Sequence, residues 1–73
     1  MIITLESTKK VVTLNGTPAR VWEGTTESGI KLHAFITRIA VNETEDTTQF
    51  NKELQQQKAP SAEVLSIPLR MLI

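Results

Sequence analysis

The residue best suited to acid–base chemistry is His33, the only histidine among 73 residues. A general base needs a nucleophile or substrate within hydrogen-bond reach, held in a pocket. The expected strand pairing puts His33 on a sheet face beside Val21 and close to Lys31 and Glu23. No Ser lies in a nucleophile motif, and Cys is absent. We therefore interpret His33 as a partly exposed strand residue, predict no catalytic residue, and rank an enzyme that uses His33 last among the function classes.

Two segments contain the residue types of a ligand site without its spacing. Gly24–Gly29 is flanked by glycines like a phosphate-binding loop, but it lacks the Lys-Ser/Thr ending and the strand-to-helix context. Glu43, Glu45 and Asp46 are clustered, but they lack the spacing and the glycine of an EF-hand loop. We interpret these segments as a hairpin loop and a solvated helix start. With no Cys and one His, the sequence predicts no metal site and no cofactor.

Trp22 is the residue that we most expect to contribute to binding, because Trp is enriched in interface hot spots. Arg20 shares its strand face and can stack on the indole ring. The sequence equally allows Trp22 to be the centre of the core, and both interpretations stay open at this point.

A second function class is a single-stranded nucleic-acid-binding β-domain that uses Arg20, Trp22, Lys31 and Arg38. Such sheets stack bases on exposed aromatic rings flanked by basic residues. The chain has a net charge of zero, one Trp and two Phe, so the electrostatic footprint of these proteins is missing. Nucleic-acid binding is therefore the alternative to the function favoured below.

These side chains must be positioned by a sheet, and its main strand is predicted at Ile30–Val41. This is the longest apolar run, it is rich in β-branched and aromatic residues, and it contains no Gly or Pro. Apolar residues alternate at first and become nearly continuous toward Val41. This pattern predicts a strand covered on one face along its length and on both faces near its end, or a bulge near Thr37.

Asn15-Gly16 between two β-prone segments predicts a hairpin with a type I′ turn, since both residues tolerate positive φ. The pairs expected from this turn are Leu14 with Thr17 and Val12 with Ala19. A second loop is expected at Thr25–Gly29. The pairs expected from that loop are Glu23 with Lys31, Trp22 with Leu32, and Ala19 with Phe35. The opposite-charge and aromatic–aliphatic pairs favour this register. The predicted strands cover residues 2–5, 10–14, 17–24, 30–41 and 67–72.

One helix is predicted at Asp46–Gln57, with Asp46 or Thr47 as its N-cap. Its apolar stripe consists of Phe50 and Leu54, spaced i,i+4. A helix this short is marginal in water, so we expect it to dock on the sheet through these two residues.

The C-terminal segment Ile67–Ile73 is strongly apolar, whereas chain ends are normally polar and loose. We predict that it forms an edge strand or an exchange arm. Both faces of the predicted sheet are partly apolar, so each needs a packing partner, and one helix can pack on only one face. A short chain without disulfides or metals then gains stability by oligomerisation.

The sequence therefore predicts an α+β fold in a single domain, residues 1–73. It comprises a small antiparallel β-meander of three or four strands, one helix packed on one face, and the C-terminal edge strand or exchange arm. The favoured function is a small non-enzymatic interaction module, a homodimer that binds another macromolecule, with nucleic acid as the alternative partner. The candidate interface residues are Arg20, Trp22, Ile67, Leu69, Met71 and Ile73.

The sequence also gives expectations about location. Met1-Ile2-Ile3 is followed by polar residues, and no apolar run has the length of a membrane span. We therefore expect neither a signal peptide nor a membrane segment. The size, neutral charge and lack of Cys favour a cytoplasmic accessory protein of bacteria or a phage.

Overall fold

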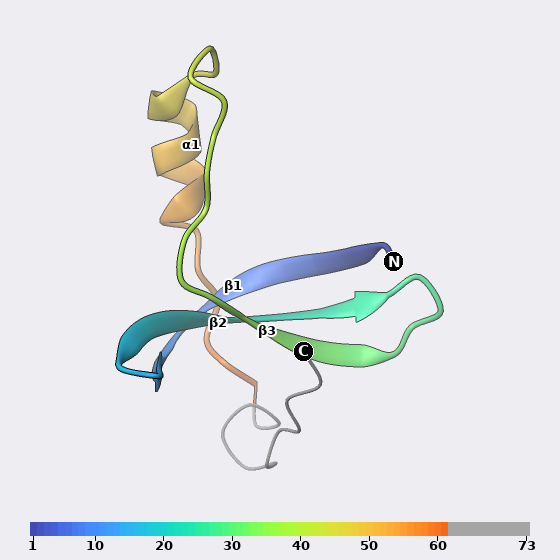
Figure 1. Cartoon of the computed structure of the whole chain (residues 1–73). Helices are drawn as coiled ribbons and strands as arrows, with labels where there is room; N and C mark the ends of the chain where they lie inside the picture. The colour runs from blue at the N-terminus through green and yellow to red at the C-terminus, as the bar shows by residue number, and fades with distance from the viewer. Residues whose placement is uncertain (62–73) are drawn as a thin grey trace.

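The computed structural model describes residues 1–61 of the chain. Within them, three antiparallel strands form one sheet in the order β1-β2-β3, and one short helix follows in sequence. The bounds are Ile3–Leu14 for β1, Thr17–Thr26 for β2, Lys31–Ile36 for β3 and Thr47–Leu54 for α1 (Figure 1). The predicted α+β class, with a three-stranded antiparallel sheet and one helix, is confirmed. The predicted strand at 67–72 and the interface residues Ile67, Leu69, Met71 and Ile73 lie outside the described residues.

β1 is one long strand where the sequence predicted two short ones, at 2–5 and 10–14. The polar residues between them do not end the strand, because a bulge absorbs them. Ser7 pairs with Trp22 and Val11 with Arg20, so the three residues between Ser7 and Val11 lie opposite Val21 alone. A bulge of this kind bends the strand and increases its twist.

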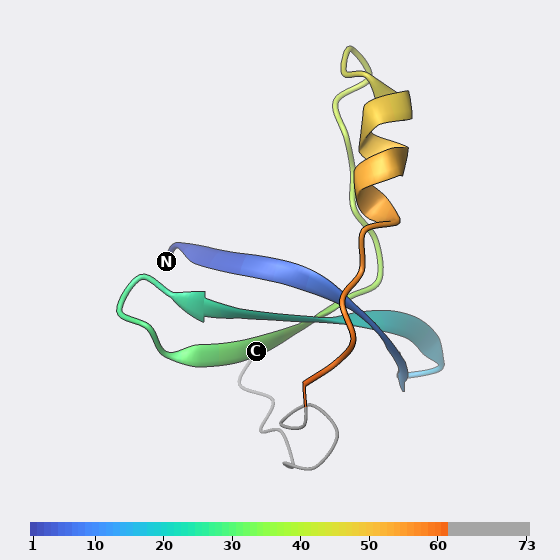
Figure 2. The same ribbon diagram turned by 180° about the vertical axis from the view of Figure 1, so that it is seen from behind.

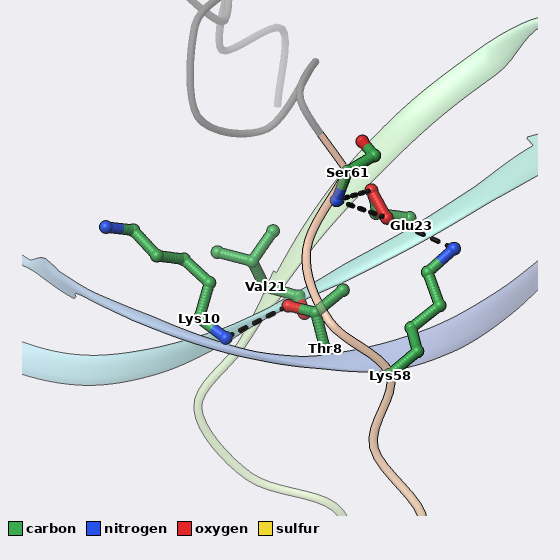
Figure 3. Close-up of polar contacts among 6 residues, drawn as sticks. All are labelled: Thr8, Lys10, Val21, Glu23, Lys58 and Ser61. Carbon is green, nitrogen blue, oxygen red and sulfur yellow. Dashed lines mark hydrogen bonds and ion pairs between the residues drawn. The ribbon is translucent and has the colours of Figure 1, made fainter.

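Side-chain hydrogen bonds replace the main-chain bonds that the bulge disrupts. Thr8 is fully buried, and its Oγ1 donates to the Val21 carbonyl oxygen at 2.7 Å and accepts from the Lys10 N–H at 3.2 Å (Figure 3). Arg20 Nη1 donates to the Thr8 carbonyl oxygen at 2.9 Å. Because buried polar groups are costly when they are unpaired, these bonds fix the geometry of the bulge.

The turn between β1 and β2 is the predicted one. Asn15 and Gly16 have φ angles of 49° and 82°, as a type I′ turn requires. The observed pairs are Leu14 with Thr17 and Val12 with Ala19, which confirms the predicted register of this hairpin.

The predicted register between β2 and β3 is wrong by two residues. The predicted pairs were Trp22 with Leu32, Glu23 with Lys31, and Ala19 with Phe35. The observed pairs are Trp22 with Ala34, Glu23 with His33, and Val21 with Phe35. A shift of two residues keeps every side chain on its predicted face, because the side-chain period of a strand is two.

The loop between β2 and β3 explains the different register. β2 continues to Thr26, so the loop is shorter than expected. The Gly29 N–H donates to the Thr26 carbonyl oxygen, and the Thr26 N–H donates to the Ile30 carbonyl oxygen, both at 3.0 Å. Gly29 has a φ of 89°, which is the left-handed conformation that a three-residue hairpin loop places at this position.

β3 ends at Ile36 rather than at the predicted Val41. Residues 37–46 leave the sheet and run beside α1, so residues 37–57 form an arm that projects from the sheet in both views (Figures 1 and 2). The chain returns at Lys58, which forms a parallel bridge with Thr8.

α1 is shorter than the predicted helix Asp46–Gln57, and none of its residues is buried. The Asp46 carboxylate caps it by accepting the N–H groups of Thr48 at 2.9 Å and Gln49 at 3.3 Å. Phe50 is half-buried and Leu54 is exposed. The helix is therefore part of the arm, and its apolar residues Phe50 and Leu54 remain partly accessible to solvent.

The shielded apolar core is small. Among residues 1–61, the buried apolar side chains are Ala19 and Val21. Large apolar side chains that are exposed comprise Met1, Ile2, Ile3, Val11, Ile30, Ile39, Val41 and Leu54. Much of the apolar content of the arm and of the ends of the sheet is thus accessible to solvent.

Candidate functional site

Trp22 lies in the middle of β2 and is half-buried. Successive residues of a strand point to opposite faces, so Trp22 shares its face with Arg20. The pairing with β3 adds Ala34 and Ile36 to the same face. The structure thus brings Arg20 and Trp22 together, as their spacing led us to expect.

Two open hollows meet at Trp22, with volumes of about 620 Å³ and about 350 Å³. Trp22, Ile39, Phe50 and Leu54 line both of them. Ile39 belongs to the first part of the arm, and Phe50 and Leu54 belong to α1, so the arm and the sheet form one apolar area. We call the following set the Trp22 surface: Val11, Trp22, Ile36, Ile39, Phe50 and Leu54.

The Trp22 surface is partly open to solvent. Val11 and Ile39 are each 47% exposed and Leu54 is 42% exposed, while Trp22 and Phe50 are half-buried. A single exposed apolar residue is ordinary, but a contiguous apolar area drawn from a strand, a helix and a connecting segment is typical of an interaction site. Trp22 is therefore neither a shielded core residue nor a fully exposed one.

The two hollows differ in charge. The smaller one is lined by Arg20 and Arg38 and by no carboxylate of the described residues. Arg20 is held by its bond to the Thr8 carbonyl oxygen, whereas Arg38 forms no ion pair within residues 1–61. The larger hollow carries both signs, with Glu53 and Lys58 in its lining. The smaller hollow therefore favours a partner that brings negative charge.

A polar cluster around Glu23 lies on the opposite face of β2 (Figure 3). The Glu23 residue is 9% exposed, and its carboxylate accepts the Ser61 N–H at 3.2 Å and pairs with Lys58 Nζ at 3.2 Å. Burial raises the pKa of Glu23, but the hydrogen bonds from Ser61 and Lys58 together outweigh it, so the pKa lies below its ordinary value of 4.5. The carboxylate is therefore ionised at neutral pH and has fixed partners.

Further hydrogen bonds join the end of the arm to β1, and together with the cluster around Glu23 we call them the anchor. The Lys58 N–H donates to the Ser7 carbonyl oxygen at 3.1 Å, and the Lys9 N–H donates to the Lys58 carbonyl oxygen at 3.0 Å. Ser7 Oγ donates to the Gln56 carbonyl oxygen at 3.0 Å. The cluster around Glu23 thus ties the returning end of the arm to β1 and β2, which is a structural use of its buried carboxylate.

His33 lies opposite Glu23 in the sheet and is half-buried. It lines a third hollow, of about 540 Å³, together with Glu23, Lys58 and Ser61. Among the described residues, no hydrogen bond joins His33 to a serine, threonine or carboxylate. This part of the chain therefore supplies no activated nucleophile to His33.

The residues of the nucleic-acid set are divided between two faces. Arg20, Trp22 and Arg38 line the smaller hollow. Lys31 pairs with Thr25 and so lies on the other face of the sheet. A single-stranded nucleic acid bound across Trp22 would therefore meet Arg20 and Arg38 but not Lys31.

Some of the residues that matter here were not indicated by the sequence. Ile39 was expected inside a strand, and only the early end of β3 moves it into the arm. The contacts of Glu23 with Lys58 and Ser61 join residues far apart in the chain, and no local pattern signals such contacts. Phe50 and Leu54 could be identified as helix anchors from their i,i+4 spacing.

Within residues 1–61, no three His, Asp or Glu side chains come together in a way that could hold a metal ion. The one helix of that region is too short and too polar to cross a bilayer. No protein-family model, curated protein or solved structure matches this chain, so its function must be inferred from the geometry of these surfaces.

Proposed function

We propose that this protein is a small non-enzymatic interaction module that works as a homodimer and binds another macromolecule. One observation carries the proposal. Among residues 1–61, the buried apolar side chains are Ala19 and Val21, whereas the Trp22 surface stays partly open to solvent. A contiguous apolar area that remains exposed is typical of an interaction site.

A second copy can cover the exposed apolar side chains of this surface, and their removal from water favours that association. The small shielded core, Ala19 and Val21 among residues 1–61, supports the same conclusion, since so short a chain gains stability from a second subunit.

The use of the buried titratable group supports a non-enzymatic role. Glu23 is the most buried carboxylate of residues 1–61, and its partners Lys58 and Ser61 belong to the chain itself. Glu23 lines the third hollow, but the Ser61 N–H and Lys58 Nζ engage both of its carboxylate oxygens. A general base needs an oxygen that can accept a proton from a substrate, whereas Glu23 holds the end of the arm in place.

Single-strand nucleic-acid binding is the second candidate, favoured by the position of Arg20, Arg38 and Trp22 around one hollow. Titration with single-stranded oligonucleotides at low salt, followed by the fluorescence of the only Trp, tests it directly. A salt-sensitive change in fluorescence would support this candidate. An unchanged signal at high protein concentration would eliminate it.

The test of the homodimer is the mass in solution, measured by sedimentation equilibrium over a wide range of protein concentration. We expect a mass that approaches twice 8.1 kDa as the concentration rises. A mass that stays at the monomer value at every concentration would refute self-association.

A further inference from the structure

We propose that two copies of the chain associate through the Trp22 surface with their arms antiparallel, so that the acidic tip of each arm meets the arginines at the base of the other. This inference rests on the proposed function, since it names the surface through which the module self-associates. It commits to a second copy as the occupant, and three features of the described residues support that choice.

The first feature is the shape of the arm. Residues 37–46 and α1 run side by side and project from the sheet (Figures 1 and 2). Both ends of the arm are fixed, by β3 at one end and by the bridge between Thr8 and Lys58 at the other. Ile39, Val41 and Leu54 along its length are each at least 38% exposed. A projecting, apolar and anchored segment is suited to lie against a partner.

The second feature is the distribution of charge along the arm. Arg38 stands at the base, next to the hollow that Arg20 also lines. Glu43 and Glu45 stand at the tip, where the Glu45 N–H closes a turn on the Asn42 carbonyl oxygen at 3.0 Å. Both glutamates are exposed and form no ion pair within residues 1–61. The segment from Arg38 to Glu45 is therefore positive at the base of the arm and negative at its tip.

Two-fold symmetry turns this distribution into complementarity. In an isologous interface, every contact occurs twice, with the roles of the two copies exchanged. Antiparallel arms place the tip of each copy on the base of the other and so create two equivalent attractive contacts. Arms side by side in the same direction would bring like charges together, which is unfavourable. An unrelated acidic peptide could neutralise the arginines, but it would leave the acidic tips unpaired.

The third feature is the continuity between the arm and the sheet. Ile39 and Leu54 of the arm line the same hollow as Val11 and Trp22 of the sheet. The arm and the Trp22 surface lie next to each other, so one interface can cover both. The extended stretch from Arg38 to Glu43 spans at most about 20 Å, a length that fits such an interface.

The experiment is a charge exchange between two variants. Variant one carries Arg38→Glu, and variant two carries Glu43→Lys with Glu45→Lys. Variant one places a carboxylate at position 38 against the acidic tip of its partner, and variant two places two ammonium groups against Arg38 of its partner. In each variant alone, a contact between like charges replaces an attractive one, and we expect dimerisation to weaken by roughly tenfold or more. In an equimolar mixture, both contacts pair opposite charges, so we expect a heterodimer close to wild-type affinity. Lys10→Glu and Glu27→Lys change the same charges at exposed positions outside both hollows, and they should leave dimerisation unchanged.

A cross-link provides a second readout. Val41 lies midway between Arg38 and the tip, so in antiparallel arms it lies closest to the two-fold axis. Because the chain has no Cys, Val41→Cys creates a unique thiol. We expect it to form a disulfide-linked dimer under mild oxidation, and Glu27→Cys, in the distant hairpin loop, to remain monomeric on denaturing gels.

The outcomes separate this inference from the function on which it rests. If the wild type dimerises but the mixture of variants gives no heterodimer, the antiparallel arrangement is wrong and the homodimer stands. If both variants dimerise like the wild type, the arrangement is wrong as well. If the wild type is a monomer at every concentration, both proposals fall. A heterodimer shows that both variants fold, and the circular dichroism of each variant alone, compared with that of the wild type, shows this independently when no heterodimer forms.

Discussion

Replacing Glu23 should detach the end of the arm from the sheet, and two substitutions distinguish the forces involved. Glu23→Ala removes both the ion pair with Lys58 and the acceptor for the Ser61 N–H. Glu23→Gln keeps an acceptor oxygen of nearly the same shape but removes the negative charge. The difference between the two variants therefore measures the hydrogen bond separately from the charge.

The structure sets the size of each effect. The Lys58 side chain is 44% exposed, so solvent screens the ion pair and it contributes about 1 kcal/mol at most. The Ser61 N–H is partly buried and bonded to an ionised oxygen, and a hydrogen bond of that kind contributes about 1.5–3 kcal/mol. We expect Glu23→Gln to lower the free energy of unfolding by about 1 kcal/mol and Glu23→Ala by about 2–3 kcal/mol. For a domain of this size, the larger loss lowers Tm by roughly 10–20 °C.

The pH dependence provides an independent check. The pKa of Glu23 is 4.5 in the unfolded chain and lower in the folded protein, because the bonds from Ser61 and Lys58 outweigh the effect of burial. The stabilisation from this carboxylate is therefore complete above pH 4.5 and is lost as the pH falls through the folded pKa. Other carboxylates titrate in the same range, but the difference between wild type and Glu23→Gln isolates this one. We expect that difference to shrink as the pH falls below 4.5.

The assay is urea denaturation followed by the fluorescence of Trp22, which neighbours Glu23 on β2. All proteins are compared at one concentration, because self-association adds to apparent stability. Equal stabilities of Glu23→Ala, Glu23→Gln and wild type at neutral pH would show that the cluster around Glu23 does not hold the arm. A difference between wild type and Glu23→Gln that grows as the pH falls would contradict the lowered pKa.

Other substitutions test the local geometry. Thr8→Val removes the hydroxyl bonded at 2.7 Å to a β2 carbonyl and should cost about 1–3 kcal/mol in urea denaturation, whereas Thr8→Ser should stay near wild type. Gly24→Ala would place a Cβ in direct clash with the Thr4 carbonyl oxygen, so β1 and β2 must separate and we expect a loss above about 2 kcal/mol. A Cβ at Gly16 would meet nothing within 4 Å, but Gly16 has a φ of +82°, so we expect Gly16→Ala to cost only about 1–2 kcal/mol. An equal cost for Gly16→Ala and Gly24→Ala would refute the close approach of β1 and β2. Asp46→Ala removes the N-cap and should reduce helical circular dichroism and cost about 1 kcal/mol, while Asp46→Asn should retain the cap.

The features that could be predicted from the sequence are those determined by neighbouring residues. Asn15-Gly16 specifies a type I′ turn by its own φ preferences, and the register of that hairpin follows from the turn. Asp46 caps α1 because its carboxylate reaches N–H groups two and three residues later. In both cases the energetic preference is contained within a few residues, so no knowledge of the remaining fold is needed.

The register between β2 and β3 shows how local reasoning fails. The charge and aromatic pairs that favoured the predicted register are worth only about 0.2–1 kcal/mol each. The loop instead closes tightly around Gly29 in the left-handed conformation, with two main-chain hydrogen bonds. Closure of the loop therefore decides the register, and the cross-strand pairs adapt to it.

The bulge and the arm could not be predicted, because distant segments determine them. Thr8 is polar, yet it is fully buried because the Val21 carbonyl and the Lys58 segment supply partners. The run through Ile39 and Val41 has strand composition, yet β3 ends before it. The apolar pattern of a segment indicates that its side chains are to be buried. It does not specify whether a sheet, a helix or a second copy of the chain buries them.

In the proposed dimer, these distant contacts determine how the surface binds. Thr8 and Arg20 fix the bulge beneath the Trp22 surface, and Glu23 fixes the returning end of the arm through Lys58. A surface that is already ordered loses less conformational entropy on association than one that must fold on binding. Loosening the anchor by Glu23→Ala should therefore weaken dimerisation, although Glu23 lies on the opposite face of the sheet. The affinity of the two copies for each other should therefore depend on the stability of the contacts between Glu23, Lys58 and Ser61.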